Sequence, residues 1–360
     1  MKIKDKNLYY VGGYVRDEIL GLPSNDIDYC YEGNAINFVR FLNVIKENPD
    51  FGTVRIKTDD YEIDIASTRI EEYPKPGHLP VVNNIGCSLK DDLKRRDFTI
   101  NALAKNTITG EIIDYFNGLE DLRNKKLRVL HENSFIDDPS RVIRGLKFSI
   151  RFGFDLEENT LKLQKEYLDN INYDLSYHRL KKELKETFNL NSYEAFTRFV
   201  EQKIYKLLGD NQKVFKLNPK VETLVGKYMP KNVWLIYLDA FDLSKFELTN
   251  EEQEIVNSYN NLKNINFNTE IEIYNSFKGA PIESILIYAC TVNYEVAILY
   301  LEKLSKIRVL ISGSDLKVLG INQGKIYQEI FDYLLQKKIQ NPNLTKEEEL
   351  NIVKLKFINN

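Results

Sequence analysis

The sequence predicts an α+β protein in which a sheet with associated helices comes first and helices alone follow. Three observations support this fold class. Residues 7–31 carry strand, turn, helix and strand signals in succession, residues 51–69 have the pattern of a β-hairpin, and from residue 135 onward apolar residues recur at helical spacing. We therefore expect one mixed domain at the N-terminus and helical domains after it.

Composition limits the class of protein. The chain has 360 residues, enough for two or three domains, and its hydrophobic and charged fractions of 43% and 29% are typical of globular proteins. The net charge is −3, so any binding of nucleic acid must rest on local positive charge. Three isolated cysteines, no signal-peptide core and no apolar run of membrane-spanning length predict a cytoplasmic protein without membrane contact.

The first stretch, residues 7–31, is the most informative part of the sequence. Residues 8–11 are apolar and favour a strand, and Gly12-Gly13 allows a sharp turn that brings the backbone close to a ligand. Residues 14–20 have helical character, and Gly21-Leu22-Pro23 ends that helix.

Asp26 and Asp28 follow on a predicted strand. They are two residues apart, so both carboxylates face the same side, where they repel each other unless a cation lies between them. Mg²⁺ prefers oxygen ligands and usually binds one or two carboxylates together with substrate phosphates. This stretch could thus hold a nucleotide, with Arg16 and the glycine amides on its phosphates. The alternative is a surface strand with two solvated aspartates.

Residues 35–48 have helical periodicity, and the hairpin follows. Its arms are residues 52–57 and 61–69, and residues 58–60 form its turn. Asp64 lies on the second arm and could project into the same cleft as a third carboxylate. A solvated alternating strand is the simpler interpretation of that arm.

The next segment combines a predicted loop with a basic cluster. Residues 70–92 contain three prolines and two glycines and predict a long loop, which in a compact domain is usually functional. Arg95 and Arg96 beside Asp97 could bind phosphate, although a solvated charge cluster is possible. Asn101 lies among apolar residues and needs hydrogen-bond partners. A last hairpin includes residues 112–114.

Residues 135–152 predict a helix with an arginine stripe. Asp138 occupies an N-cap position and Pro139 the first helical position. Arg141, Arg144 and Arg151 fall within an arc of about 80° on one face. No acid lies between Arg141 and Arg151, so the stripe is unpaired within its own helix and suits a polyanionic ligand.

The remaining sequence indicates helices and little more. Residues 201–231 contain seven lysines and three acids, an excess that could contact an RNA backbone, although a solvated helical surface is an equal alternative. We find no fixed-period repeat and no catalytic motif in this half.

Four of these motifs together resemble one family, the class II tRNA nucleotidyltransferases or CCA-adding enzymes, which share motifs with bacterial poly(A) polymerases. The resemblance covers about residues 7–190. It rests on residues 12–17 with Asp26-Ile27-Asp28, on residues 95–102, on residues 114–122, and on Asp138-Pro139-Ser140-Arg141 with Arg144.

The resemblance implies a polymerase-β-like nucleotidyltransferase head over residues 1–134. A helical neck over residues 135–200 would recognise the base, and a helical body and tail over residues 201–360 would bind tRNA. It implies that Asp26 and Asp28 bind Mg²⁺, with Asp64 as the third catalytic carboxylate. The implied nucleotide-binding residues are Gly12, Gly13, Arg16, Arg96, Asp97, Asn101, Asp138, Arg141 and Arg144.

The implied roles within that set are more specific. Asp97 would contact the ribose, and Asp138 and Arg141 would read the base in place of a nucleic-acid template. The predicted loop at residues 70–92 would help the switch from C to A addition. Lys147 stands where some members have arginine, and Ser176-Tyr177-His178-Arg179 stands near a common Glu-Arg pair, which leaves the role of that acid unfilled.

The expected function is template-independent addition of CMP and AMP from CTP and ATP to the 3′ end of tRNA, with Mg²⁺ as cofactor and release of pyrophosphate. Alternatives within the class are an A-adding enzyme, a CC-adding enzyme and a poly(A) polymerase. An alternative of another class is a non-catalytic RNA-binding paralogue, against which the Asp26/Asp28 pair argues, because a binder needs no pair of metal-binding carboxylates.

Overall fold

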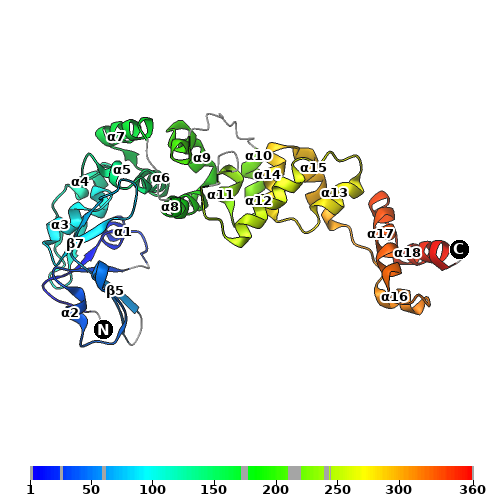
Figure 1. Cartoon of the computed structure of the whole chain (residues 1–360), viewed down its shortest axis with the longest axis horizontal. Helices are drawn as coiled ribbons and strands as arrows, with labels where there is room; N and C mark the ends of the chain where they lie inside the picture. Colours follow the sequence, from blue (N-terminus) through cyan, green and yellow to red (C-terminus); the bar gives the residue numbers. More distant parts are fainter. Residues whose placement is uncertain are drawn as a thin grey trace. The chain divides into compact units, whose positions relative to one another are not determined.

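The computed structural model describes residues 3–24, 27–58, 62–171, 177–209, 220–238, 243 and 245–358. Contacts divide the chain into two units, one formed by Met1–Lys213 with Phe241–Glu247 and one by Val214–Ala240 with Leu248–Asn360 (Figure 1). Every strand of the described residues lies in the first unit, and the second is helical. The predicted α+β class is confirmed, whereas the boundaries at residues 134 and 200 remain predictions.

A seven-stranded sheet forms the centre of the first unit. Its order is β3-β4-β5-β2-β1-β8-β9, and neighbouring strands are antiparallel except β2 and β5, which are parallel. The strands are β1 (Leu8–Val11), β2 (Asp28–Tyr31), β3 (Val44–Asn48), β4 (Thr53–Lys57), β5 (Glu62–Ser67), β8 (Leu103–Asn106) and β9 (Ile112–Asp114).

The first predicted elements are confirmed. β1 leads through the glycine turn into α1 (Gly13–Ile19) and then β2. β4 and β5 pair as the predicted hairpin, although Asp59, Asp60 and Tyr61 at its turn lie outside the described residues. β8 and β9 form the last predicted hairpin.

Two predicted segments are wrong. Residues 35–48 are helical only in α2 (Ala35–Val39), and residues 44–48 form β3, because that segment pairs with β4 at the sheet edge. Residues 70–92 are not a continuous loop. β6 (Arg69–Glu72) and β7 (Val81–Ile85) pair antiparallel, and α3 (Leu89–Lys94) follows, with Ser88 capping its first turn.

One sheet face packs on α3 and forms a core. Tyr9 and Val11 alternate toward this face, as the strand period requires, and contact Leu89 and Leu93 of the helix. The end of α3 therefore brings residues 95–97 over the carboxyl end of β1, where the glycine turn begins.

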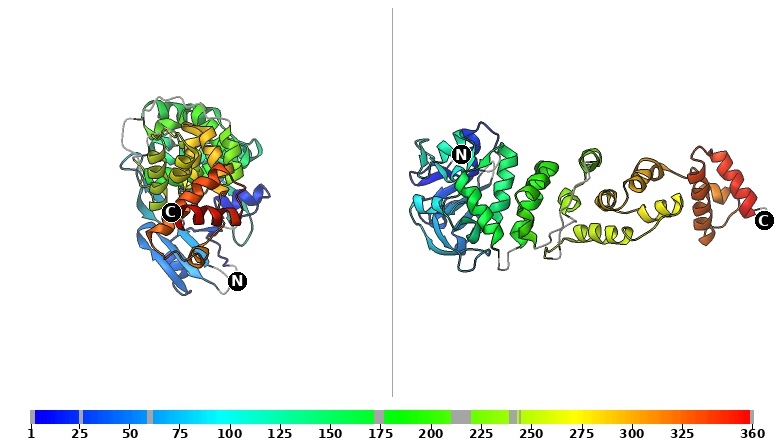
Figure 2. Two further views of the ribbon diagram at one scale, coloured as in Figure 1. Left: turned by 90° about the vertical axis from the view of Figure 1, so that its right-hand side faces the viewer. Right: turned by 90° about the horizontal axis from the view of Figure 1, so that it is seen from above.

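Helices follow the sheet in the first unit (Figure 2). α6 packs against α8, and the apolar residues Val142, Ile143 and Leu146 of α6 are buried. It begins at Ser140, one residue later than the capping prediction, with Pro139 at the N-cap. The helices are α4 (Gly118–Arg123), α5 (Ser134–Asp137), α6 (Ser140–Phe152), α7 (Glu158–Asp169), α8 (Tyr177–Leu190) and α9 (Ser192–Glu201), and the short strands β10 (Lys126–Leu127) and β11 (Asp155–Leu156) pair beside them.

The second unit has its own apolar core. α14 is buried along most of its length, and a further cluster around Leu316, Ile330, Leu334 and Val353 joins the last three helices. The helices are α10 (Lys220–Tyr228), α11 (Val233–Leu238), α12 (Asn250–Leu262), α13 (Glu270–Phe277), α14 (Ile282–Thr291), α15 (Tyr294–Ile298), α16 (Gly313–Val318), α17 (Lys325–Gln340) and α18 (Lys346–Val353). No helix in the described part of the chain is long and apolar enough to cross a membrane.

Candidate nucleotide-binding site

A cleft of about 850 Å³ in the first unit gathers most of the predicted site residues. Its walls come from the glycine turn and α1, the start of β2, the β6–β7 connection, residues 95–101, α6 and α8. Ten of the twelve predicted residues line it: Gly12, Gly13, Arg16, Asp28, Arg96, Asp97, Asn101, Asp138, Arg141 and Arg144. Asp64 lies beside it, and Asp26 lies outside the described residues.

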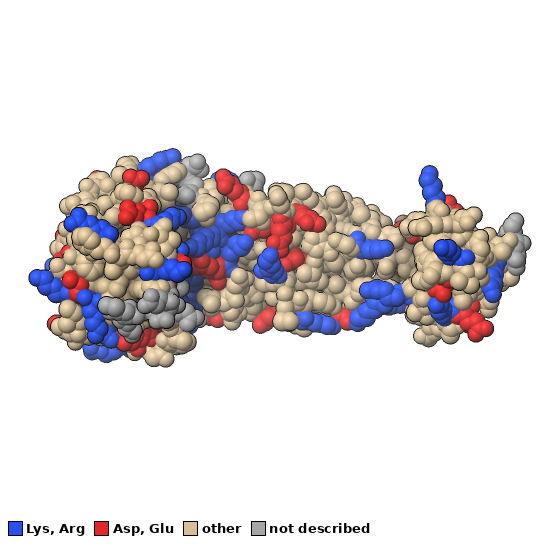
Figure 3. Space-filling view, turned by 90° about the horizontal axis from the view of Figure 1, so that it is seen from below, with Lys and Arg blue, Asp and Glu red and all other residues tan. Residues whose placement is uncertain are grey.

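The cleft is positively charged, in contrast to the whole chain. Among the described residues that line it, nine are lysine or arginine and five are aspartate or glutamate. Elsewhere the two signs are mixed, as Figure 3 shows for one face of the molecule. This local excess of positive charge suits a polyphosphate.

The glycine turn has little space for a side chain. Gly12 has φ +66°, a left-handed conformation, and a Cβ atom there would lie 2.8 Å from Nη1 of Arg96. The amide of Gly12 donates to the carbonyl of Leu103, which fixes the turn against β8. The absence of a side chain lets Arg96 reach across the turn into the cleft.

Two of the predicted carboxylates are neighbours on adjacent strands. Asp28 and Asp64 are register partners in the parallel pair β2–β5, so their side chains leave the same sheet face. Both are exposed, and a second hollow of about 550 Å³ joins them. Within the described ranges no three His, Cys, Asp or Glu residues form a metal-binding group, and Asp26 is outside those ranges.

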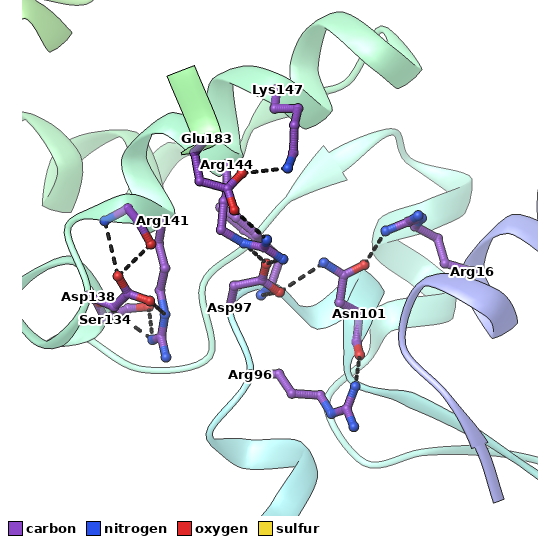
Figure 4. A network of polar contacts seen from close by, with 12 residues as sticks. Arg16, Arg96, Asp97, Asn101, Ser134, Asp138, Arg141, Arg144, Lys147 and Glu183 are labelled. Carbon is purple, nitrogen blue, oxygen red and sulfur yellow. Dashed lines mark hydrogen bonds and ion pairs between the residues drawn. The ribbon is translucent and has the colours of Figure 1, made fainter. Parts of the chain in front are cut away.

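Asp97 is the centre of a buried polar network (Figure 4). Its Oδ2 accepts from Nε of Arg144 at 2.7 Å, and its Oδ1 accepts from Nδ2 of Asn101 at 2.9 Å. Oδ1 of Asn101 in turn accepts from Nη1 of Arg16 at 2.5 Å. Burial alone would raise the pKa of Asp97, but Arg144 and the hydrogen bond from Asn101 lower this pKa to about 2. The network holds Asp97 ionised and fixes two predicted nucleotide ligands.

The arginine stripe on α6 is paired by acids from other elements. Arg144 contacts Glu183 of α8 at 3.0 Å as well as Asp97, and Arg151 contacts Asp17 of α1 at 3.0 Å. The stripe is unpaired within its own helix, as predicted, but its charge is partly neutralised by the fold. Asp97 and Glu183 raise the pKa of Arg144, despite burial that opposes this shift.

Sequence reasoning missed several residues of the cleft. Glu183 of α8 binds both Arg144 and Lys147, which line the cleft. Ser176, near the expected Glu-Arg pair, lies outside the described residues. Arg179 reaches Asp138, and Glu71 pairs with Arg95. These partners are distant in the chain or lie in lysine-rich helix sequence, so no local pattern marks them.

Asp138 and Arg141 lie close together, and both side chains form hydrogen bonds with other protein groups. Oδ1 of Asp138 accepts from the amide and hydroxyl of Ser140, and its Oδ2 accepts from Nη2 of Arg179 at 2.5 Å. Arg141 donates to Oγ of Ser134 at 2.7 Å and to the carbonyl of Arg95 at 2.9 Å. Asp138 and Arg141 are 5% and 3% exposed, so both are structural as well as cleft-lining residues.

The fold and the cleft are those of a nucleotidyltransferase, and comparisons agree. The Poly A polymerase head domain family matches residues 8–128. The A-adding tRNA nucleotidyltransferase of Halalkalibacterium halodurans is 30% identical over 90% of this chain and 82% of its own length, and that of Geobacter sulfurreducens is 32% identical over 96% of this chain. This chain spans only 44% of the length of the Geobacter protein.

A solved structure gives the same result for the fold. The structure named Thermotoga maritima CCA-adding enzyme complexed with tRNA_CCA is 27% identical, covers 97% of this chain and 90% of its own, and has a TM-score of 0.73. The chain belongs to the tRNA nucleotidyltransferase family, which confirms the resemblance seen in its motifs.

Proposed function

We propose that this protein adds CMP and AMP to the 3′ end of tRNA, with CTP and ATP as substrates and pyrophosphate as the leaving product. The observation that carries the proposal is the positive cleft of about 850 Å³, because it gathers the glycine turn, Asp28, Arg96 and the start of α6. A nucleoside triphosphate is an anion of matching charge and size. In the reaction, the 3′-hydroxyl oxygen of the RNA bonds to the α-phosphorus, the bond to pyrophosphate breaks, and the hydroxyl proton is released.

The exposed carboxylates fit a divalent cation. Asp28 and Asp64 present oxygen ligands side by side on one sheet face, the donor type that Mg²⁺ prefers. We assign these two residues, together with Asp26, to an Mg²⁺ site. When bound there, Mg²⁺ would lower the pKa of the attacking hydroxyl and balance the charge of the leaving group.

The chain's own residues would orient the nucleotide. Arg96 and Arg16 would contact its phosphates. Asp97 would contact the ribose hydroxyls in exchange for one of its present bonds, because Arg144 donates to one of its oxygens while Asn101 and the amide of Phe98 donate to the other. Because Arg16 is held by Asp17 and Asn101, its guanidinium is already oriented before a ligand binds.

Addition of AMP alone is a second candidate. The relatives that match 90% and 96% of this chain are named A-adding enzymes, whereas the solved relative is named a CCA-adding enzyme. The second unit, which the motifs do not cover, would select the RNA in either case.

Transfer itself is tested by incubating the full chain with a tRNA lacking its 3′ end, Mg²⁺ and α-labelled CTP or ATP. We expect labelled RNA and an equal amount of pyrophosphate. Binding of the tRNA without incorporation of either nucleotide would favour the non-catalytic RNA-binding alternative.

Base choice would depend on Asp138 and Arg141. Cytosine and adenine both offer an exocyclic amine donor beside a ring-nitrogen acceptor, whereas uracil and guanine reverse that order. A carboxylate that accepts and a guanidinium that donates therefore admit C and A. We expect Asp138→Ala and Arg141→Ala each to raise incorporation of UMP or GMP relative to CMP by roughly 5- to 150-fold, from about 1–3 kcal/mol of lost discrimination.

The relative use of four nucleotides is the deciding measurement for this prediction. Because both side chains are buried and bonded, melting temperature should fall whether they read bases or only support the fold. Ser140→Ala is the matched control, since it removes a hydroxyl partner of Asp138 without removing the carboxylate. An unchanged nucleotide preference in both alanine variants would leave Asp138 as a structural residue bonded to Ser140 and Arg141 as a structural or phosphate-binding residue.

The β6–β7 connection, residues 73–80, would serve the change from C to A addition. Tyr73 and Leu79 line the cleft, the ring of Tyr73 lies 6.0 Å from the guanidinium of Arg141, and the amide of Gly77 donates to the carbonyl of Ile136. We expect replacement of residues 73–80 by Asn-Gly, a turn that suits two antiparallel strands, to spare CMP addition and impair AMP addition at least tenfold.

Separate measurement of the rates of CMP and AMP addition tests this role of the β6–β7 connection. Equal loss of both rates would mean that it serves folding or general catalysis. A retained thermal transition would show that the shortened hairpin has not unfolded the first unit.

A further inference from the structure

Arg55 forms a two-pronged ion pair with a carboxylate of the proposed metal site. Nε of Arg55 donates to Oδ1 of Asp64 at 2.7 Å, and Nη2 donates to Oδ2 at 2.7 Å. Nη1 also lies 3.8 Å from Oε2 of Glu62. Both oxygens of Asp64 therefore face one guanidinium in this structure.

The strands place Arg55 in line with two carboxylates of the proposed metal site, those of Asp28 and Asp64. Arg55 is the register partner of Asp64 in the antiparallel pair β4–β5, and Asp64 is the register partner of Asp28 in the parallel pair β5–β2. The three side chains thus form one row across the sheet, on one face. We call the pair Asp28 and Asp64 the carboxylate row, and Arg55 lies next to it.

The ion pair is suited to exchange. The side chains of Arg55 and Asp64 are 46% and 59% exposed, and exposed pairs hold each other weakly because water screens them. A divalent cation carries twice the charge of a guanidinium and can approach both carboxylates of the row. The metal and Arg55 therefore compete for the same oxygens of Asp64.

A phosphate-binding position is available beside the row. The 550 Å³ hollow contains Arg55, Lys46, Arg95 and Arg96, and its described lining has five positive and three negative residues. The arginine fork matches phosphate oxygens as well as it matches a carboxylate.

We propose that Arg55 is the counterion of the carboxylate row in the metal-free protein, and that a divalent cation displaces it so that its guanidinium binds a backbone phosphate of the RNA 3′ strand. Metal binding and RNA binding then become positively coupled, because the metal releases a phosphate-binding arginine. The RNA part rests on the proposed function, whereas the competition with metal does not. Arg55 acts through Asp64 and phosphate and is a positioning residue.

The first test measures Mn²⁺ binding by calorimetry, on the full chain without nucleotide or RNA. Arg55→Gln should bind Mn²⁺ about two- to fivefold more tightly than the natural chain. Lys57→Gln is the control, because it removes the same charge from the same face of β4 at the position opposite Glu62. Equal or weaker Mn²⁺ binding by Arg55→Gln would overturn the proposal, as would equal tightening in Lys57→Gln.

The second test measures the anisotropy of a labelled RNA hairpin with the acceptor-stem shape and a free 3′ end, with Mg²⁺ or with chelator. We expect Mg²⁺ to strengthen binding to the natural chain and to Lys57→Gln at least threefold, and Arg55→Gln to lose most of that gain. An equal gain in all three chains would overturn the coupling. If the natural chain incorporates no nucleotide, the proposed function fails, but the Mn²⁺ result still decides whether Arg55 competes with metal.

Discussion

Asp28→Asn should reduce nucleotide incorporation by at least roughly 10³-fold while leaving folding and the metal-independent part of tRNA binding largely intact. Loss of a metal ligand removes several kcal/mol of charge stabilisation in the transition state, and each ~1.4 kcal/mol is a factor of ten in rate. Asp28 is exposed at the start of β2 and asparagine has nearly the same size, so the substitution should not disturb the core. Single-turnover incorporation, RNA anisotropy and thermal unfolding should be measured on the same preparation.

Asp155→Asn is a matched control, because its carboxylate is 77% exposed and lies at β11, outside the cleft. It should match the natural chain in all three measurements. Turnover by Asp28→Asn near the natural rate, or turnover by the natural chain in excess chelator, would contradict the assignment of Asp28 to metal.

Asp97→Ala should destabilise the first unit by about 1.5–3 kcal/mol, because it removes a charged partner of Arg144, which keeps Glu183, and leaves the buried amide of Asn101 without its acceptor. For a unit of this size each kcal/mol corresponds to about 2–4 °C, so we expect its thermal transition to fall by roughly 3–12 °C. Calorimetry is the suitable measurement, since Trp234, the only tryptophan, belongs to the second unit.

Glu186→Ala is the control for this network, because Glu186 binds Lys147 at the exposed end of the same cluster. Its effect should stay below about 1 kcal/mol. A similar small effect of Asp97→Ala would show that the buried network contributes little to stability.

The pH dependence of stability gives a separate test of Asp97. Its pKa falls from 3.8 to about 2 in the folded chain, so the unfolded chain binds the proton more readily. The resulting stabilisation, about 2 kcal/mol, is present above about pH 4 and is lost as pH falls toward 2. Asp97→Asn should therefore show a shallower loss of stability over that range than the natural chain.

The sequence predicts local elements well where one pattern dominates. The β1–α1–β2 segment, the β4–β5 hairpin and α6 appear near their predicted positions because alternation, glycine and capping signals are local. β3 and β6–β7 were not predicted, since an edge strand is specified by the partner on which it packs. In residues 70–92 the turn signals of three prolines concealed two short strands.

The candidate site, like the fold, was predictable only where short local motifs carry it. Ten predicted residues meet in one cleft, and their motifs could be recognised because four short segments carry them: the glycine turn with α1, the start of β2, residues 96–101 and the start of α6. The counterions were not predictable, since Asp17 and Arg151 are 134 residues apart and Arg144 and Glu183 are 39 apart. Only the packing of α1 and α8 against α6 brings such pairs together.

Addition of both CMP and AMP by this protein can be tested with tRNAs that end at successive positions of the 3′ end. Three tRNAs, ending before the first C, after C and after CC, are each incubated with CTP alone or ATP alone, and product lengths are read at single-nucleotide resolution. We predict CMP addition to the first two tRNAs and one AMP added to the third. Addition of AMP to the third tRNA with no CMP added to the first two would contradict the claim and leave an A-adding enzyme.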